Sequence, residues 1–223
     1  MFGSRSPDIA ALLPREVVTV VATPRHQLMP LLEAEADYLA SRSMQPQRKA
    51  EFRAGRACAR EALARLGFAG WPLLPAATRE PKWPDGFVGS ITHCDRFCAA
   101  AVTKRDVCAG IGIDAETISR VSDRIAPLVC TDGELRALLK CRTAGRKILL
   151  ALIFSAKESV FKAVFPSTRL LFDLKDIELT IEPGPNAFSA HAQGKCLKRI
   201  CKRLEGRFEL GESYLVTTAL LND

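Results

Sequence analysis

Ten residues, VCAGIGIDAE at 107–116, constrain the fold more than any other segment of this sequence. The first seven are apolar or small, which predicts a buried strand. Asp114 and Glu116 follow where that strand ends. Side chains at i and i+2 of a strand point to one face, so both carboxylates should face the same way. Two like charges this close repel each other, so either one carboxyl stays protonated or a cation lies between them.

Length and charge set the class of protein. The chain has 223 residues, enough for one large domain or two small ones with a substantial core. Lys and Arg outnumber Asp and Glu by 32 to 25, and the net charge of +7 favours an anionic partner such as nucleic acid, a phosphorylated ligand, an acidic protein or an anionic membrane. The longest apolar run, ILLALIF at 148–154, is far shorter than the ~20 residues of a membrane helix. With no secretory pattern at the N-terminus, we expect a cytoplasmic protein with reduced cysteines.

The hydrophobic periodicity predicts an α+β chain. Helices are expected at 26–40, 46–66, 131–142 and 147–165, and the Pro-rich segment 70–86 is expected to be a loop. Besides the strand ending in GIDAE, strands are expected at 16–22, 87–92, 98–103, 176–182, 187–192, 207–210 and 213–220. This order suggests two halves that meet around residues 103–108.

The segment FSAKESVFKA contains a second group of polar side chains. On a helix, Glu158 and Lys162 lie on one face at i and i+4, which is also the spacing of an ordinary exposed ion pair. Together with Asp114 and Glu116, however, Glu158 would supply a third oxygen ligand for a hard cation. Mg²⁺ uses few carboxylates and completes its shell with water and substrate phosphates. Lys157 and Lys162 would then face those phosphates, an arrangement typical of phosphoryl-group transfer.

A third group consists of candidate phosphate ligands. They lie on the long helix, in the Pro-rich loop and on the strand after it: Arg48, Arg53, Arg56, Arg60, Arg79, Lys82, Ser90, Thr92 and His93. Arg53, Arg56 and Arg60 share one helix face by their spacing. Taken singly, these residues also fit a solvated helix face and a histidine hydrogen-bonded to the backbone.

The motifs GSITHC, GIDAE and FSAKESVFKA, taken together, resemble those of the 4′-phosphopantetheinyl transferases. RKAEFRAGRACAREAL and EPKWPDGFVGSITHC resemble the surfactin-type branch, which is typified by the enterobactin-synthase enzyme. The resemblance runs from 46 to 116 and from 148 to 165. It implies two similar α+β halves related by a pseudo-twofold, residues 1–105 and 106–223, with coenzyme A in the cleft between them. It also implies a monomer.

The resemblance implies a reaction and a site. The phosphopantetheine arm of coenzyme A would move to a serine of an apo acyl or peptidyl carrier protein, and adenosine 3′,5′-bisphosphate would leave. Mg²⁺, with Mn²⁺ as the alternative, would be held by Asp114, Glu116 and Glu158. Glu158 would be the catalytic base and Lys162 would stabilise the leaving phosphate. The coenzyme A ligands would be Arg48, Arg56, Arg79, Ser90, His93, Lys157 and Lys162, with no role for nucleic acid or a membrane.

Two other functions are also compatible with parts of the sequence. A metal-dependent nuclease needs a basic chain with carboxylates and a lysine, but its common Glu-x-Lys motif lies on a strand soon after the Asp. Here Glu158 follows Asp114 by 44 residues and lies on a helix. A non-catalytic module that binds nucleic acid or an acidic protein explains the charge but not the carboxylates. If the chain is a transferase, we expect the carrier to dock on residues 117–135 and the helix after them, whereas the pathway it serves, whether siderophore, nonribosomal-peptide, polyketide or fatty-acid synthesis, stays open.

Overall fold

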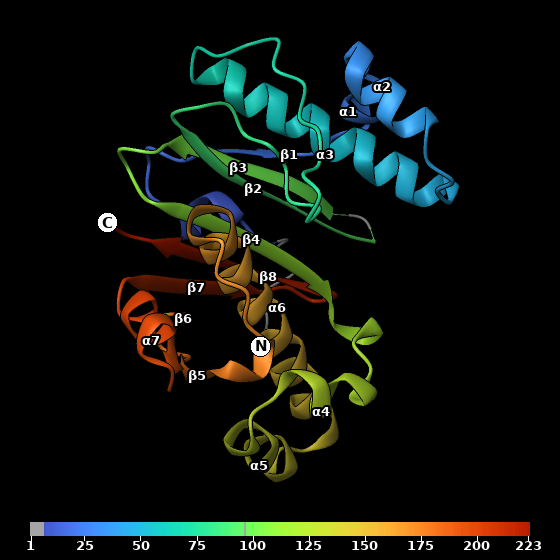
Figure 1. Ribbon diagram of the computed structural model, residues 1–223. Helices are drawn as coiled ribbons and strands as arrows, with labels where there is room; N and C mark the ends of the chain where they lie inside the picture. Colours follow the sequence, from blue (N-terminus) through green and yellow to red (C-terminus); the bar gives the residue numbers. More distant parts are fainter. Residues whose placement is uncertain (1–6, 96) are drawn as a thin grey trace.

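Two antiparallel sheets organise the computed structural model, which describes residues 7–95 and 97–223 (Figure 1). The smaller sheet has the strand order β1-β3-β2, with β1 at Val18–Val21, β2 at Phe87–Cys94 and β3 at Phe97–Lys104. The larger sheet has the order β4-β8-β7-β6-β5. Its strands are β4 at Gly110–Thr117, β5 at Ile177–Glu182, β6 at Ala187–Ala192, β7 at Leu204–Leu210 and β8 at Tyr214–Leu221.

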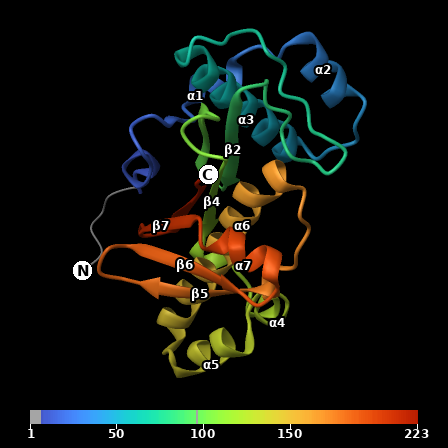
Figure 2. The same cartoon turned by 60° about the vertical axis from the view of Figure 1, so that its left-hand side comes forward.

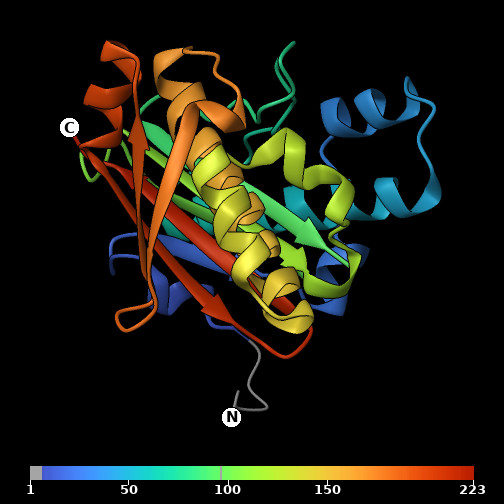
Figure 3. The same ribbon diagram turned by 90° about the horizontal axis from the view of Figure 1, so that it is seen from below.

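Each sheet has one long helix against it (Figures 2 and 3). Helix α3, Pro46–Arg65, packs its buried Cys58, Ala59 and Leu63 against the smaller sheet. Helix α6, Thr143–Thr168, packs against the larger sheet and is buried along most of its length. The shorter helices are α1 at Pro24–Leu28, α2 at Glu33–Ala40, α4 at Ala126–Val129, α5 at Asp132–Lys140 and α7 at Lys195–Cys201. The predicted α+β class is therefore confirmed.

Three local predictions differ from the structure. The helix expected over 26–40 is two helices, because Pro30 disfavours the helical conformation at Met29, which is extended (φ −62°, ψ 136°). Helix α6 begins at Thr143 and continues past Pro166, whereas 147–165 was expected. Helices α4 and α7 were not predicted at all, since their four and seven residues are too few to show a clear period.

A shared core joins the two halves. One cluster of buried side chains contains Ala99 from β3, Ile113 from β4 and Val216 from β8. Ile9, near the start of the described chain, belongs to the same cluster. The domain boundary expected after residue 105 falls between β3 and β4 and stays a prediction, as does the pseudo-twofold.

Strands β2 and β4 lie next to each other where the sheets meet, and side chains connect them. The Ser90 hydroxyl accepts a hydrogen bond from the Ile113 amide at 3.1 Å, and the Thr92 hydroxyl donates to Asp114 Oδ1 at 3.4 Å. Polar residues at the end of β2 therefore lie beside the carboxylates at the end of β4.

Glycines in β4 explain how closely α6 packs. A Cβ atom at Gly112 would lie 1.8 Å from the Ser159 carbonyl oxygen, and one at Gly110 would lie 2.1 Å from that of Ala163. The helix backbone therefore touches the strand backbone. This contact places Glu158 and Lys162 beside Asp114.

No helix within residues 7–95 and 97–223 is long and apolar enough to cross a membrane.

Substituting Gly112 tests the close packing of α6 on β4. We expect Gly112→Ala to lower the free energy of unfolding by roughly 1–3 kcal/mol, because the added methyl forces two backbones apart. Urea unfolding measures this difference. The control is Gly184→Ala, where nothing lies within 4 Å of the added Cβ. Equal stability of the two variants would contradict the packing argument.

Candidate active site

A cavity of about 690 Å³ lies between the two halves. Helix α3 and the loop around Arg79 line it from the N-terminal half, and the end of β4 and one face of α6 line it from the C-terminal half. It brings together all the predicted site residues except Lys157, namely Arg48, Arg56, Arg79, Ser90, His93, Asp114, Glu116, Glu158 and Lys162.

Lys162 neutralises one side of the Asp114 carboxylate. Its ammonium donates to Asp114 Oδ1 at 2.6 Å and to the Ile113 carbonyl at 3.2 Å. The other oxygen, Asp114 Oδ2, is buried and has no hydrogen-bond partner within the described residues. Because buried carboxylate oxygens are rarely left unpaired, this atom fits a site for a cation.

The two glutamates near Asp114 are held in an unfavourable setting for negative charge. Burial, with the Asp114 carboxylate adding to it, raises the pKa of Glu116 to about 7. Burial also raises the pKa of Glu158, an effect that Lys162 opposes and Asp114 reinforces. Three carboxyl groups that repel one another in a partly buried site are stabilised by a positive ion.

These donors fit Mg²⁺ chemically without forming a complete set of ligands. All are hard oxygen atoms, as Mg²⁺ prefers. Across the described ranges, no group of three or more His, Cys, Asp or Glu side chains is arranged to hold a metal ion. A bound cation would therefore draw the carboxylates closer together and take further oxygens from water or a substrate phosphate.

Arg48 and His93 form a linked pair on the opposite wall. Arg48 donates a hydrogen bond to His93 Nε2, and it also donates to Glu51 Oε2 at 3.2 Å. That glutamate oxygen lies 3.6 Å from His93 Nε2. Burial lowers the pKa of His93, and Arg48 and Lys162 lower it further while Glu51 opposes them. A neutral His93 therefore accepts from Arg48. Glu51 was not among the predicted site residues, although its i+3 spacing from Arg48 on α3 is a signal for an ion pair.

Arg56 is buried yet positioned by specific contacts. Its Nε donates to the Leu73 carbonyl at 2.9 Å, and its guanidinium lies over the Phe52 ring, 4.3 Å from the centroid. Burial lowers its pKa to about 10, so it remains charged at neutral pH. Arg79 lines the same cavity, and its own backbone is left-handed, with φ 76°.

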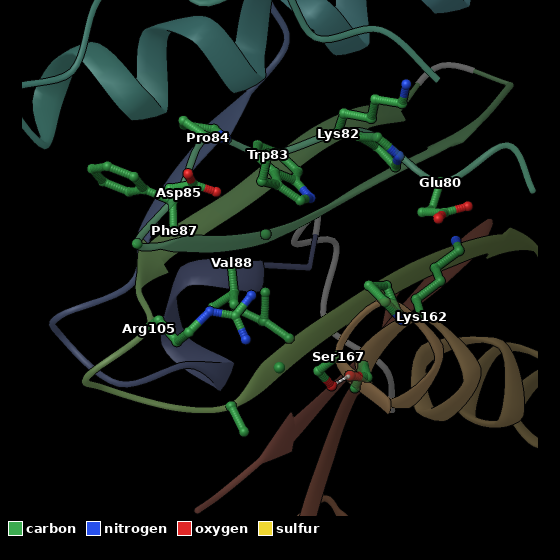
Figure 4. A pocket seen from close by; sticks show the side chains of 18 of the residues that line it. Glu80, Lys82, Trp83, Pro84, Asp85, Phe87, Val88, Arg105, Lys162 and Ser167 are labelled. Atoms are coloured by element: carbon green, nitrogen blue, oxygen red, sulfur yellow. Dashed lines mark hydrogen bonds between the residues drawn. The ribbon is translucent and has the colours of Figure 1, made fainter. Parts of the chain in front are cut away.

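Three other candidate phosphate ligands from the sequence lie outside this cavity. Arg60 pairs with Glu35 and donates to the Pro30 carbonyl, so it holds the α2 region in place. Arg53 is exposed and does not line the cavity. Lys82 lines a smaller cavity of about 430 Å³ next to the first, with Glu80 and Lys162 between the two (Figure 4).

The assignment of Lys157 to a phosphate is wrong. Its side chain is fully buried, and its ammonium donates to Glu134 Oε2 at 2.6 Å and to the Val129 carbonyl at 2.9 Å. The Glu134 carboxylate also accepts from the amides of Thr131 and Leu179. Lys157 therefore anchors α6 to the start of α5. The Thr131–Glu134 capping box was predicted, but only the packed fold reveals its buried partner.

Comparisons with known proteins identify the family of this chain. Residues 34–103 match the 4′-phosphopantetheinyl transferase N-terminal domain, and residues 110–219 match the 4′-phosphopantetheinyl transferase superfamily. The chain is 41% identical to the 4′-phosphopantetheinyl transferase Svp of Streptomyces mobaraensis, over 94% of this chain and 87% of that protein. It is 37% identical to the 4′-phosphopantetheinyl transferase PptT of Mycobacterium tuberculosis, over 78% of this chain and 79% of that protein.

Two further similarities cover about half of the chain. Enterobactin synthase component D of Salmonella typhi is 38% identical over 55% of this chain and 50% of that protein. The solved holo-[acyl-carrier-protein] synthase of Neisseria meningitidis is 19% identical over 52% of this chain and 99% of that chain, with a TM-score of 0.42.

The chain therefore belongs to the 4′-phosphopantetheinyl transferase superfamily, in its two-domain branch. It is an enzyme that transfers the 4′-phosphopantetheinyl group from coenzyme A to carrier proteins. This activity replaces the nuclease and the non-catalytic binding module as explanations of the basic charge and the carboxylates.

The raised pKa of Glu116 predicts a pH dependence of stability. A carboxyl whose pKa rises from 4.5 to about 7 on folding stabilises the fold fully below pH 4.5 and loses that contribution as the pH rises through 7. In EDTA, the thermal midpoint of the wild type should therefore fall relative to that of Glu116→Gln over this range. Glu182→Gln, at the exposed end of β5, is the control. Parallel profiles for all three proteins would contradict the raised pKa.

Proposed function

We propose that this transferase is Mg²⁺-dependent and binds coenzyme A in the cavity between its halves, with the pyrophosphate near Asp114 and Lys162. The observation that supports this most directly is the Asp114 carboxylate: one oxygen accepts from the Lys162 ammonium, and the other is buried with no hydrogen-bond partner among the described residues. An ammonium beside a carboxylate oxygen that could bind a cation suits a ligand with two adjacent phosphates.

The basic wall suits the nucleotide end of coenzyme A. Arg48, Arg56 and Arg79 line the cavity from the N-terminal half, and planar guanidinium groups bind phosphate through paired hydrogen bonds. His93 and Ser90 line the same cavity. The Ser90 hydroxyl also accepts from the Ile113 amide, so it joins β2 to β4 as well as lining the site.

The reaction requires one proton acceptor and one group that stabilises the leaving phosphate. The serine oxygen of the carrier forms a bond to the phosphorus that bears the pantetheine arm, and the bond from that phosphorus to the bridging oxygen breaks. Glu158 is the proposed base, directly or through a water molecule, because it lines the cavity from the same helix as Lys162. Lys162 stabilises or protonates the oxygen of the departing adenosine 3′,5′-bisphosphate.

Asp114, Glu116 and Glu158 would hold the metal ion. When bound, Mg²⁺ neutralises charge on the phosphate oxygens and orients them. The protein side chains supply binding and proton transfer: the arginines bind the nucleotide, Lys162 binds the pyrophosphate, and Glu158 accepts the serine proton.

The acceptor is proposed from relatives and from surface chemistry. Because enterobactin synthase component D is among the relatives, we propose carriers of siderophore or nonribosomal-peptide synthesis as substrates.

Helices α4 and α5 expose Leu128 and Leu139, at 71% and 73%. The same part of the chain also carries exposed basic side chains, namely Arg124, Arg136, Lys140 and Arg142. This combination suits an acidic, amphipathic carrier helix. The enzyme is expected to act as a monomer.

Removing the carboxylates tests the metal and base assignments. Asp114→Ala and Glu158→Gln should each lower the transfer rate by about 100-fold or more while leaving the circular dichroism spectrum unchanged. Intact-protein mass spectrometry of an apo carrier with coenzyme A and Mg²⁺, with a parallel reaction in EDTA, measures the transfer. Full activity in either variant, or in EDTA, would remove that group from the mechanism.

Charge reversal tests the docking surface. Lys140→Glu should raise the KM for the carrier by about tenfold without changing the KM for coenzyme A, since a like charge then faces the acidic partner. The matched control is Lys198→Glu on α7, which makes the same charge change elsewhere on the surface. If both variants behave alike, α5 is not part of the docking surface.

A further inference from the structure

Two ion pairs join the halves of the molecule at opposite ends of β2, within the residues that the structure describes. Glu80, in the loop before β2, pairs with Arg169 at the end of α6. Asp95, directly after β2, pairs with Arg120 at 2.6 Å. The first of these pairs is next to both cavities, because Glu80 lines each of them.

Glu80 belongs to a tight turn at residues 76–80. Its Oε2 accepts from the Thr78 hydroxyl at 2.5 Å, and its Oε1 accepts from Arg169. Although burial alone would raise the pKa of Glu80, the hydrogen bonds from Thr78 and Arg169 bring it below its usual value. The carboxylate is therefore charged, and only 11% of the side chain is exposed.

The turn presents Arg79 in a conformation that needs support. Arg79 and Arg169 have left-handed backbones, φ 76° and 57°, and Asn186 is the third such non-glycine residue within the described ranges. Residues with a Cβ rarely adopt this conformation unless their surroundings hold them there, and such residues gather at ligand clamps. Two of the three residues therefore lie at this ion pair, one on each side of the cleft.

The turn at residues 76–80 is held mainly by hydrogen bonds among its own residues. The Ala76 amide donates to the Glu80 carbonyl at 2.8 Å, and the Arg79 amide donates to the Ala76 carbonyl at 2.9 Å. The ion pair with Arg169 instead ties it to the other half. Arg169 lines the smaller cavity but not the larger one, so it lies outside the proposed coenzyme A site.

We propose that Arg169 is a positioning residue for the donor substrate: through Glu80 it fixes the 76–80 turn and so directs Arg79 into the coenzyme A cavity. This inference rests on the proposed function, specifically on Arg79 as a ligand of coenzyme A. An exposed ion pair alone contributes little to stability. Here the ion pair affects the position of one side chain that binds a phosphate, rather than the stability of the whole fold.

The first experiment separates binding from catalysis. Arg169→Met should raise the KM and the dissociation constant for coenzyme A about threefold to fivefold and leave kcat unchanged at saturation. The matched control is Arg105→Met. Arg105 is exposed and lines the same smaller cavity, with Glu80 and Lys162 at the other end (Figure 4). The Arg105→Met substitution removes the same positive charge without changing a partner of Glu80, so it measures the general electrostatic effect on coenzyme A binding.

A double-mutant cycle shows whether Arg169 acts through Arg79. Arg79→Ala should weaken coenzyme A binding about tenfold or more. In that background, Arg169→Met should have no further effect, because the group that it positions is gone. Additive effects would overturn the inference.

Hydrogen exchange supplies a measurement that does not depend on catalysis. The amides of Ala76, Arg79 and Lys82 are hydrogen-bonded within the loop. Their exchange should be faster in Arg169→Met than in wild type or Arg105→Met, without substrate. Unchanged exchange would overturn the inference.

Different results would contradict the proposed function and the role of Arg169. If Arg79→Ala binds coenzyme A as wild type does, the role of Arg79 in the proposed function is wrong and the inference falls with it. If Arg79→Ala weakens binding but Arg169→Met matches Arg105→Met, the proposed function stands and the inference alone is overturned.

Discussion

The backbone contact between β4 and α6 determines where the proposed active-site residues of this transferase lie. Gly110 and Gly112 let the helix approach until its carbonyl oxygens occupy the space of a side chain. Asp114 follows Gly112 on the strand, and Glu158 precedes Ser159 on the helix, so the same contact brings their carboxyl groups to one cavity. The glycine and the aspartate of GIDAE thus have separate physical roles, one in packing and one in chemistry.

That contact also concentrates negative charge where water is partly excluded. Burial raises the pKa values of Glu116 and Glu158, and Asp114 adds to both effects. Lys162 opposes them from within the cluster. Its ammonium reaches only one oxygen of Asp114, so the charge is incompletely compensated. The proposed cation and polyphosphate would relieve this repulsion, and their binding would stabilise the folded protein.

Sequence patterns predicted those parts of the structure that depend on local rules. Periodicity identified β4 and α6, and the capping signal identified the start of α5. Nine of the ten predicted site residues line one cavity. Lys157 was misassigned because its partner, Glu134, lies 23 residues away and meets it only once α5 packs on α6. Glu80 was missed for the same reason, because Arg169 lies 89 residues further along the chain. Glu51 was missed although Arg48 lies three residues before it on α3, since only the fold brings His93 beside that pair.

The two halves contribute different sets of charged groups to one site, and Glu51 and Glu80 lie among the basic side chains of the N-terminal half. The N-terminal half supplies the guanidinium groups and His93, and the C-terminal half supplies the three carboxylates together with Lys162. A ligand with phosphates at several positions can satisfy both sets only if the halves keep a fixed relation. Three kinds of contact maintain that relation: the shared core around Ile113, the hydrogen bonds that Ser90 accepts and Thr92 donates, and the ion pairs beyond each end of β2. Since the core and the strand contacts are buried while each ion pair has an exposed arginine, substitutions in the core should alter folding, whereas substitutions in the ion pairs should alter the geometry of binding.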